Sequence, residues 1–359
     1  MYKTVKNIWV NSCSLFGLFC VVIVCESAQG GTGHNSVAKG YIDRIVVKAD
    51  SLENNLVGEN NERQVIVYLP PSYIKNQHKH YPVVYVLHGF GGSAEAWFAA
   101  EPGSPQIDKT MNALVSEGLV NEMIVVVPDT NSRHQGTWYT NNPITGNWED
   151  FITKDLLNKI EQRYRVKRGK ESRGIIGHSM GGFGAIKMSL EHSHLYSAVV
   201  FLSPAPPLVA PGSSALGWGL YKNLKPQIDK YTGNPGELTE TANIFMSLAH
   251  IFIPSKTNPP SFILPTPTKS DFKEMDDFNL TAMASALTDT KKYKHMAFKS
   301  EIGSREGVSN EFVHVMNIFE RKGMNIEYQI FDGGHTDHLQ VGTRESLIFV
   351  SRNLNHELK

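Results

Sequence analysis

The chain has 359 residues, of which 41% are hydrophobic and 19% charged, and its formal net charge at pH 7 is zero. This composition is that of a globular protein long enough for one large α/β domain with insertions, although the length alone also allows two domains. The neutral charge, without long runs of like charge, argues against a nucleic-acid partner and a polybasic membrane patch, so we expect a small neutral substrate.

The first 28 residues have the organisation of a secretory signal peptide. Lys3 and Lys6 precede an apolar run over residues 15–25, and small residues that suit a cleavage site follow this run. The glycines in residues 29–40 indicate a flexible tether. We therefore expect export to the periplasm or the extracellular space, without stable membrane insertion.

Two alternatives for the leader remain open. A single membrane anchor would use residues 8–25, which are nearly long enough to span a bilayer but contain polar residues. A lipoprotein would be modified at Cys25, where the preceding Val24 is bulkier than such signals prefer. Cys13, Cys20 and Cys25 are the three cysteines of the chain, so cleavage of the leader would leave no cysteine nucleophile, disulfide or cysteine-bound metal.

Apolar segments and helical stripes alternate along the rest of the chain. The apolar segments predict strands at 64–69, 83–87, 123–127, 174–177, 198–202, 296–302 and 326–331. The stripes predict helices near 107–117, 152–164, 180–190, 310–322 and 344–354. Strands that alternate with helices predict an α/β domain over residues 41–355, with a mostly parallel central sheet and helices on both faces.

The alternation fails over residues 203–295, which are interrupted by prolines. A long irregular segment in a compact domain is usually functional. We expect an insertion over the active-site end of the sheet, with some helix at 280–287. The hypothesis is that this lid-like, partly mobile cover selects the acyl group without supplying catalytic groups.

The segment Gly177-His178-Ser179-Met180-Gly181 fits the G-x-S-x-G nucleophile elbow. The glycines allow the backbone to turn sharply, because a side chain there would collide with the neighbouring strand or helix. The alternative is a glycine-rich turn that only connects a buried strand to a packed helix. The strand before the motif and the helical stripe after it favour the elbow, and Ser179 is the predicted nucleophile.

An elbow serine requires an acid and a histidine, which follow it in that chain order after late strands. His335 lies in the loop that leaves the last predicted strand, and Glu301 and Glu306 lie near the end of the preceding one. Glu306 is the preferred acid because it follows a turn, whereas Glu301 falls within the strand and would need a partner there. Asp332 and Asp337 are expected to be turn or rim residues.

Residues 88–92 follow the strand that is expected to supply an oxyanion donor. The backbone amides of Phe90 and Met180 are the predicted oxyanion hole. His88 and His178 adjoin glycine turns, where a histidine more often packs and bonds to the backbone than acts as a base.

Trp97, Trp138 and Tyr139 are candidates for lining an acyl or sugar pocket, although large aromatic residues near a sheet end are about as often core residues. The spacing of His335 and His338 suggests metal ligands only weakly, because no third ligand accompanies them. We expect no metal and no cofactor.

Several motifs together resemble the esterase D family of α/β-hydrolases over about residues 41–355. They are Tyr68-Leu69-Pro70-Pro71-Ser72-Tyr73, Tyr81-Pro82-Val83-Val84-Tyr85-Val86-Leu87-His88-Gly89, Asn147-Trp148-Glu149-Asp150-Phe151, Gly177-His178-Ser179-Met180-Gly181-Gly182 and Gly333-Gly334-His335. This family includes S-formylglutathione hydrolases, feruloyl and acetyl-xylan esterases, enterochelin esterases and the antigen 85 mycolyltransferases. The resemblance implies an α/β-hydrolase fold, with Ser179 as nucleophile, His335 as base, and Glu306 at the position where the family has an aspartate.

The expected function is a secreted serine carboxylesterase that hydrolyses short-chain or carbohydrate-linked acyl esters through an acyl-enzyme. The expected partner is a small-molecule or carbohydrate ester. An acyltransferase of the antigen 85 type and a feruloyl or acetyl-xylan esterase remain open, as does a non-catalytic binding module. The leader and the cysteine pattern make the cytosolic formylglutathione branch a poorer match.

Overall fold

The computed structural model of the protein describes residues 39–205, 208 and 212–354. The expected leader, residues 1–28, lies outside these residues, as does nearly all of the expected tether, so both stay predictions. Of the helices in the described part, none combines the length and apolarity needed to cross a membrane.

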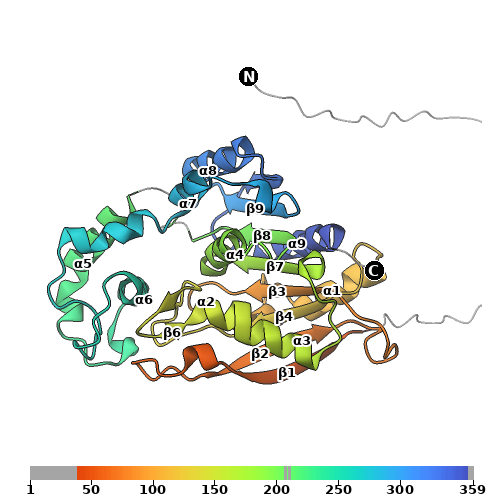
Figure 1. Cartoon of the computed structure of the whole chain (residues 1–359), viewed down its shortest axis with the longest axis horizontal. Coiled ribbons are helices and arrows are strands. Elements are labelled where there is room, and N and C mark those ends of the chain that lie inside the picture. The colour runs from red at the N-terminus through yellow and green to blue at the C-terminus, as the bar shows by residue number, and fades with distance from the viewer. Residues whose placement is uncertain (1–38, 206–207, 209–211, 355–359) are drawn as a thin grey trace, which may run out of the picture. The chain divides into compact units, whose positions relative to one another are not determined.

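Within the described residues, eight strands form one sheet in the order β1-β2-β4-β3-β7-β8-β9-β10 (Figure 1). These strands are β1 (Tyr41–Lys48), β2 (Glu62–Leu69), β3 (Val83–Leu87), β4 (Ile124–Pro128), β7 (Arg173–His178), β8 (Ala198–Leu202), β9 (Ala297–Gly303) and β10 (Ile326–Phe331). Strands β1 and β2 pair antiparallel, as do β2 and β4, and the remaining pairs are parallel. The predicted mostly parallel sheet is therefore confirmed.

The central strands are almost entirely apolar because both faces of the sheet are covered; the exceptions are Arg173 and His178 at the two ends of β7. Every residue of β3, β4, β7 and β8 is buried. Along β3, Val83, Tyr85 and Leu87 belong to one hydrophobic cluster, whereas Val84 and Val86 belong to the other. This alternation follows from the two-residue period of a strand and divides the core into two layers.

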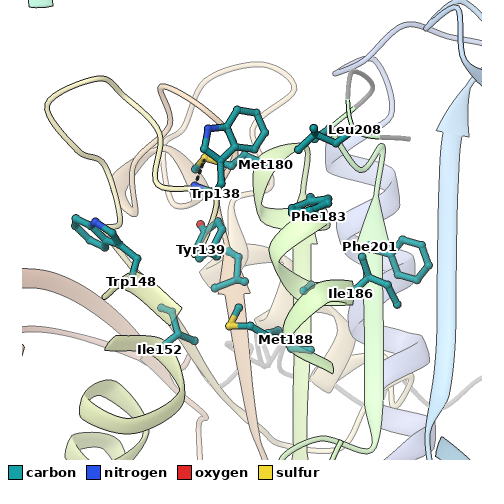
Figure 2. Packing of buried hydrophobic residues seen from close by; sticks show 14 of the residues in the cluster. Trp138, Tyr139, Trp148, Ile152, Met180, Phe183, Ile186, Met188, Phe201 and Leu208 are labelled. Atoms are coloured by element: carbon teal, nitrogen blue, oxygen red, sulfur yellow. Dashed lines mark hydrogen bonds between the residues drawn. The ribbon is translucent and has the colours of Figure 1, made fainter. Parts of the chain in front are cut away.

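Helices cover both faces of the sheet, as predicted. One layer contains α2 (Trp148–Asp150), the π-helix η3 (Phe151–Leu156), α3 (Leu157–Arg163), α4 (Met180–Glu191) and α8 (Ser309–Arg321). The other contains α1 (Ile107–Ser116) and α9 (Leu339–Asn353). Figure 2 shows the first layer around α4, with Phe183 and Ile186 on the helix and Phe201 on β8. Helix α9 begins five residues earlier than predicted from the sequence.

Short elements connect these layers. They are the hairpin strands β5 (Asn141–Asn142) and β6 (Gly146–Asn147), and the 3-10 turns η1 (Asp50–Leu52), η2 (Glu95–Trp97) and η4 (Lys170–Ser172).

The insertion at residues 203–295 contains more helix than the sequence suggested. Its helices and turns are α5 (Ser213–Ile228), η6 (Pro235–Glu237), α6 (Glu240–Phe252), η7 (Lys269–Asp276), α7 (Leu280–Ala286) and η8 (Lys291–Tyr293). Helix α7 matches the one helix expected here, whereas α5 and α6 were not predicted. Helix α5 packs against η7 and α6, so tertiary contacts within the insertion stabilise it.

Helix α6 also attaches the insertion to the core. The indole Nε1 of Trp138 donates a hydrogen bond to Ser247 Oγ at 2.8 Å, and His134 Nδ1 lies 2.9 Å from Asn243 Oδ1. All four side chains are buried. The loop after β4 is therefore held between the sheet and the insertion.

Candidate active site

Ser179 stands at the sharp turn between β7 and α4. Its backbone has φ 57° and ψ −120°, a strained conformation for a residue with a side chain. A Cβ atom added at Gly177 would lie 1.9 Å from the carbonyl oxygen of Gly181, and one at Gly181 would lie 2.1 Å from that of Leu87. The structural reason given for the two glycines of the motif is confirmed.

The side chains of Ser179, His335 and Glu306 form a chain of hydrogen bonds at the carboxyl ends of the strands. His335, in the loop after β10, has its Nε2 atom 2.8 Å from Ser179 Oγ. Its Nδ1 atom lies 2.6 Å from Oε2 of Glu306, in the loop after β9. The structure therefore brings together the three residues that the sequence nominated, because parallel strands end at the same edge of the sheet.

The carboxylate of Glu306 is 2% exposed and accepts further hydrogen bonds. Its Oε1 atom accepts from Ser203 Oγ at 2.6 Å and from the Gly303 amide at 2.7 Å. Burial raises the pKa of Glu306, but hydrogen bonds from His335, Ser203 and Gly303 outweigh burial and leave the pKa below its ordinary value. The ionised carboxylate accepts a hydrogen bond from the protonated Nδ1 of His335, which leaves Nε2 unprotonated toward Ser179.

Glu301, the alternative acid, points to the other face of the sheet. It is 2% exposed, its Oε1 lies 3.0 Å from His338 Nδ1, and its Oε2 accepts from Gln329 Nε2 at 2.8 Å. Lys299, two residues earlier, also faces α9, where it pairs with Glu345. The period of β9 thus directs residue 301 toward α9 and away from His335.

The acidic residues that flank His335 lie at the rim, as expected. Arg305 Nη1 lies 2.6 Å from Asp332 Oδ1, and its Nη2 lies 3.0 Å from Asp337 Oδ2. The same oxygen of Asp337 accepts from the Gly334 amide at 2.7 Å. These contacts hold the histidine loop against the loop that carries Glu306.

His178 positions the histidine loop from below. Its Nε2 atom lies 2.9 Å from the backbone carbonyl oxygen of His335, and the two rings are 4.9 Å apart. Burial, together with the nearby charge of His335, lowers the pKa of His178 to about 4. The imidazole is therefore neutral at pH 7 and donates to that carbonyl, so its role is in packing and hydrogen bonding.

The candidate oxyanion donors come from the loop after β3 and from the first residue of α4. Met180 is the first residue of α4, so its amide has no acceptor within the helix and can bond to a developing oxyanion. Phe90 lines the same pocket as Ser179. The next residue, Gly91, donates its amide to the Gln135 carbonyl at 2.8 Å, which holds the loop in place.

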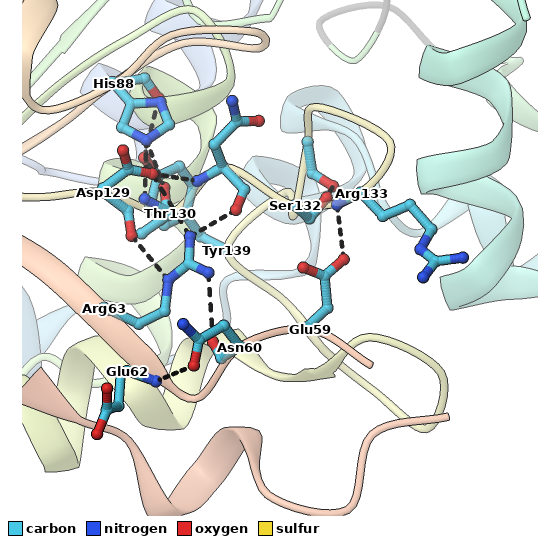
Figure 3. Close-up of polar contacts among 12 residues, drawn as sticks. Glu59, Asn60, Glu62, Arg63, His88, Asp129, Thr130, Ser132, Arg133 and Tyr139 are labelled. Atoms are coloured by element: carbon cyan, nitrogen blue, oxygen red, sulfur yellow. Dashed lines mark hydrogen bonds and ion pairs between the residues drawn. The ribbon is translucent and has the colours of Figure 1, made fainter. Parts of the chain in front are cut away.

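A buried network supports this loop from behind (Figure 3). His88 Nε2 accepts the amide of Thr130 at 2.9 Å, and the hydroxyl of Tyr139 donates to the His88 carbonyl at 2.9 Å. Burial lowers the pKa of His88, which keeps the ring neutral. Arg63 of β2 continues the network through the carbonyl of Asn131 at 2.6 Å.

The pocket around Ser179 has a volume of about 210 Å³. Trp97, Phe90, Pro105 and Leu339 give it apolar walls. Of the three aromatic residues proposed as substrate contacts, Trp97 is in the wall. Trp138 and Tyr139 are not, because they are 3% and 0% exposed and bond to the insertion and to the oxyanion loop. None of the described residues of the insertion lines this pocket.

Among the described residues, one group brings three possible metal ligands together, namely Glu149, Glu191 and His192. The ammonium of Lys187, whose side chain is 6% exposed, contacts Glu149 and lies 2.7 Å from Glu191 Oε2. Lys187 thus occupies the position that a metal cation would take, and the cluster is an ion-pair network between α2 and α4.

Sequence reasoning missed one positioning residue, Ser203, and the bonding partner of a second, His178. Ser203 was assigned only to the start of the insertion, although a serine directly after the strand beside the elbow strand is a signal for a polar contact at the sheet edge. His178 was recognised as a packing residue, but its bond to His335 joins segments 157 residues apart, which no local pattern reveals.

Comparisons with known proteins identify the family of the chain. A model of the family described as "Putative esterase" matches residues 58–336. Esterase Rv1288 of Mycobacterium tuberculosis is 34% identical over 149 residues, which are 39% of this chain and 29% of that relative. The chain therefore matches less than a third of the length of this curated relative.

Two solved structures are similar in fold. A ferulic acid esterase has a TM-score of 0.63 and 20% identity, and the match covers 88% of this chain and 99% of that one. An S-formylglutathione hydrolase from Agrobacterium tumefaciens has a TM-score of 0.55 and 16% identity, over 89% and 98% of the two chains. Both likenesses concern the α/β-hydrolase fold. Because the family model matches more than half of this chain, the chain belongs to the esterase family, whose fold here is that of the α/β-hydrolases.

Proposed function

We propose that this protein is an exported serine carboxylesterase that acts through a Ser179-His335-Glu306 triad. One observation carries the proposal: hydrogen bonds of 2.6 and 2.8 Å run without interruption from Glu306 through His335 to Ser179. Membership of the esterase family supports the same chemistry. Export rests on the signal-like leader in residues 1–28.

In the proposed reaction, His335 Nε2 removes the hydroxyl proton as Ser179 Oγ attacks the ester carbonyl carbon. The amides of Phe90 and Met180 stabilise the oxyanion, and Glu306 stabilises the imidazolium. Collapse of the intermediate expels the alcohol, which receives the proton from His335. Water then attacks the acyl-enzyme with His335 as base, and the free acid and Ser179 are released.

The proposed substrates are short-chain or carbohydrate-linked acyl esters. The pocket of about 210 Å³ suits a small acyl group, and its apolar walls favour an uncharged one. A feruloyl or acetyl-xylan esterase is a second candidate, because Trp97 offers an aromatic wall and a ferulic acid esterase shares the fold. An acyltransferase of the antigen 85 type would use the same acyl-enzyme with an alcohol in place of water.

The test is the pair Ser179→Ala and Ser270→Ala, of which Ser270 is an exposed serine of the insertion. Ser179→Ala should lose about 10⁴- to 10⁶-fold in kcat on p-nitrophenyl acetate and all labelling by a fluorophosphonate probe, with unchanged circular dichroism. Ser270→Ala should retain both. Near-wild-type hydrolysis by the Ser179 variant would refute the nucleophile assignment.

The substrate class is resolved by a panel of p-nitrophenyl acyl esters, methyl ferulate and acetylated xylan. Selective release of ferulate or of xylan-bound acetate would favour the second candidate. Transfer of the acyl group to added glucose in preference to water would favour the acyltransferase.

A further inference from the structure

The chemistry proposed for the triad divides the pocket around Ser179 into sides. In the tetrahedral intermediate, the carbonyl oxygen faces the amides of Phe90 and Met180, and the alcohol oxygen lies within hydrogen-bond reach of His335 Nε2, which protonates it. The acyl chain is the remaining substituent on the carbon that Ser179 attacks. Because the bonds of that carbon point to the corners of a tetrahedron, the acyl chain must lie against the part of the wall that belongs neither to the oxyanion donors nor to the histidine loop.

The wall residues that remain come from the segment between β3 and α1. Thr336 and Leu339 line the pocket on the side of the histidine loop, and Thr336 is exposed. Ala96, Trp97 and Pro105 line it from the segment that follows the oxyanion loop. Trp97 and Pro105 are buried, whereas Ala96 is exposed. The acyl side is therefore apolar and backed by two buried side chains, and the alcohol side opens to solvent at Thr336.

Hydrogen bonds hold this wall in place before a substrate binds. The hydroxyl of Ser104 donates to the carbonyl of Ala96 at 2.7 Å, which ties the two ends of the wall together. Thr110 Oγ1, on α1, donates to the carbonyl of Pro105 at 2.8 Å. Trp97 is 4% exposed and belongs to the hydrophobic cluster that includes residues of α1. A side chain held in a close-packed core does not move aside for a longer acyl chain.

We propose that Trp97 and Pro105 limit the acyl group to a short chain, whereas the alcohol side accepts large groups such as a sugar. The inference rests on the proposed esterase function and names what that site selects. The whole pocket around Ser179, acyl and alcohol sides together, has a volume of about 210 Å³. Since a cavity of about 150 Å³ holds a molecule the size of benzene, an acyl group of about four carbons is the longest that this space holds. Acyl selection is thus assigned to residues 95–105 and not to the insertion.

The experiment measures kcat/KM for p-nitrophenyl acetate, butyrate and octanoate, with thermal unfolding to show that each variant folds. The wild type should hydrolyse acetate and butyrate and be slow on octanoate. Trp97→Ala shortens the wall and should raise the octanoate-to-acetate ratio about tenfold or more. Ala96→Leu fills the acyl side from an exposed position and should lower the butyrate-to-acetate ratio about tenfold or more. Trp218→Ala removes an indole from the insertion, outside this pocket, and should leave both ratios unchanged.

The ratio of two substrates on one variant separates selectivity from a general loss of activity. Unchanged ratios in folded Trp97→Ala and Ala96→Leu overturn the inference, as does a wild type equally fast on octanoate and acetate. If Trp97→Ala does not fold, the butyrate ratio of Ala96→Leu decides. A shift in Trp218→Ala alone would return acyl selection to the insertion. In all these outcomes the wild type hydrolyses esters through Ser179, whereas the absence of any Ser179-dependent hydrolysis would refute the proposed function and the inference with it.

Discussion

Replacing Glu306 with glutamine tests the catalytic geometry most sharply. Oε1 of Glu306 accepts from the amide of Gly303, a donor that cannot reverse its role, and from the hydroxyl of Ser203. The amide oxygen of Glu306→Gln must therefore take the Oε1 position, which turns the NH2 group toward His335 Nδ1. Nδ1 then becomes an acceptor, the ring proton moves to Nε2, and Nε2 can no longer accept the proton of Ser179.

A wrong histidine tautomer in a Ser-His-acid triad lowers kcat by about 10⁴-fold, or roughly 5.5 kcal/mol of transition-state stabilisation. The assay is kcat on p-nitrophenyl acetate, with thermal unfolding to show that the variant folds. Glu301→Gln is the matched control, because this carboxylate is equally buried but bonds to His338 and Gln329. It should stay within about tenfold of the wild type. The reasoning fails if Glu306→Gln keeps more than about a tenth of kcat or if both variants lose equally.

Three further predictions concern stability and processing. Gly181→Ala should destabilise the fold by about 3 kcal/mol, because its Cβ would lie 2.1 Å from the Leu87 carbonyl oxygen, whereas Gly219→Ala, with nothing within 4 Å, should not; thermal unfolding compares them. Burial lowers the pKa of His250 to about 3, so the unfolded state binds more protons below about pH 6.5 and stability should fall from there toward pH 3. Urea unfolding should show that the free energy of unfolding decreases between pH 7 and pH 4. This decrease should be about 3 kcal/mol smaller in His250→Gln than in the wild type. Sequencing of the exported protein should find an N-terminus near residue 28, and an intact Met1 would favour the anchor instead.

The central strands were predictable because complete burial leaves a simple pattern. Strands β3 and β8 have the predicted bounds, and the other fully buried strands, β4 and β7, differ by one residue at each end. The edge strand β10 also has the predicted bounds, although none of its residues is buried. Strand β1 was missed because only Ile45 and Val47 are buried in it, between charged residues. Two buried positions give a pattern too short to distinguish from a loop.

The two long helices of the insertion were missed for different reasons. Helix α5 contains Gly217, Gly219 and Pro226, which lower its intrinsic helix propensity, so its contacts with η7 and α6 stabilise it. Helix α6 carried a usable signal that was overlooked. Thr239 caps it by accepting the amide of Ala242, the arrangement that a threonine before an apolar stripe predicts.

The order of the triad residues along the chain was predictable from the elbow and the late strands. The choice between the two glutamates required knowing which face of the sheet each side chain of β9 points to. Its period sends Glu301 toward α9, while Glu306, beyond the strand, turns back over the edge to His335. An aspartate at 306 would withdraw the carboxylate by one methylene from both His335 and Ser203, so the longer side chain of glutamate lets the carboxylate reach both from this loop. The distance between the loop that carries Glu306 and His335 depends on where β8, β9 and β10 end relative to one another in space. The spacing of residues along the chain does not determine it.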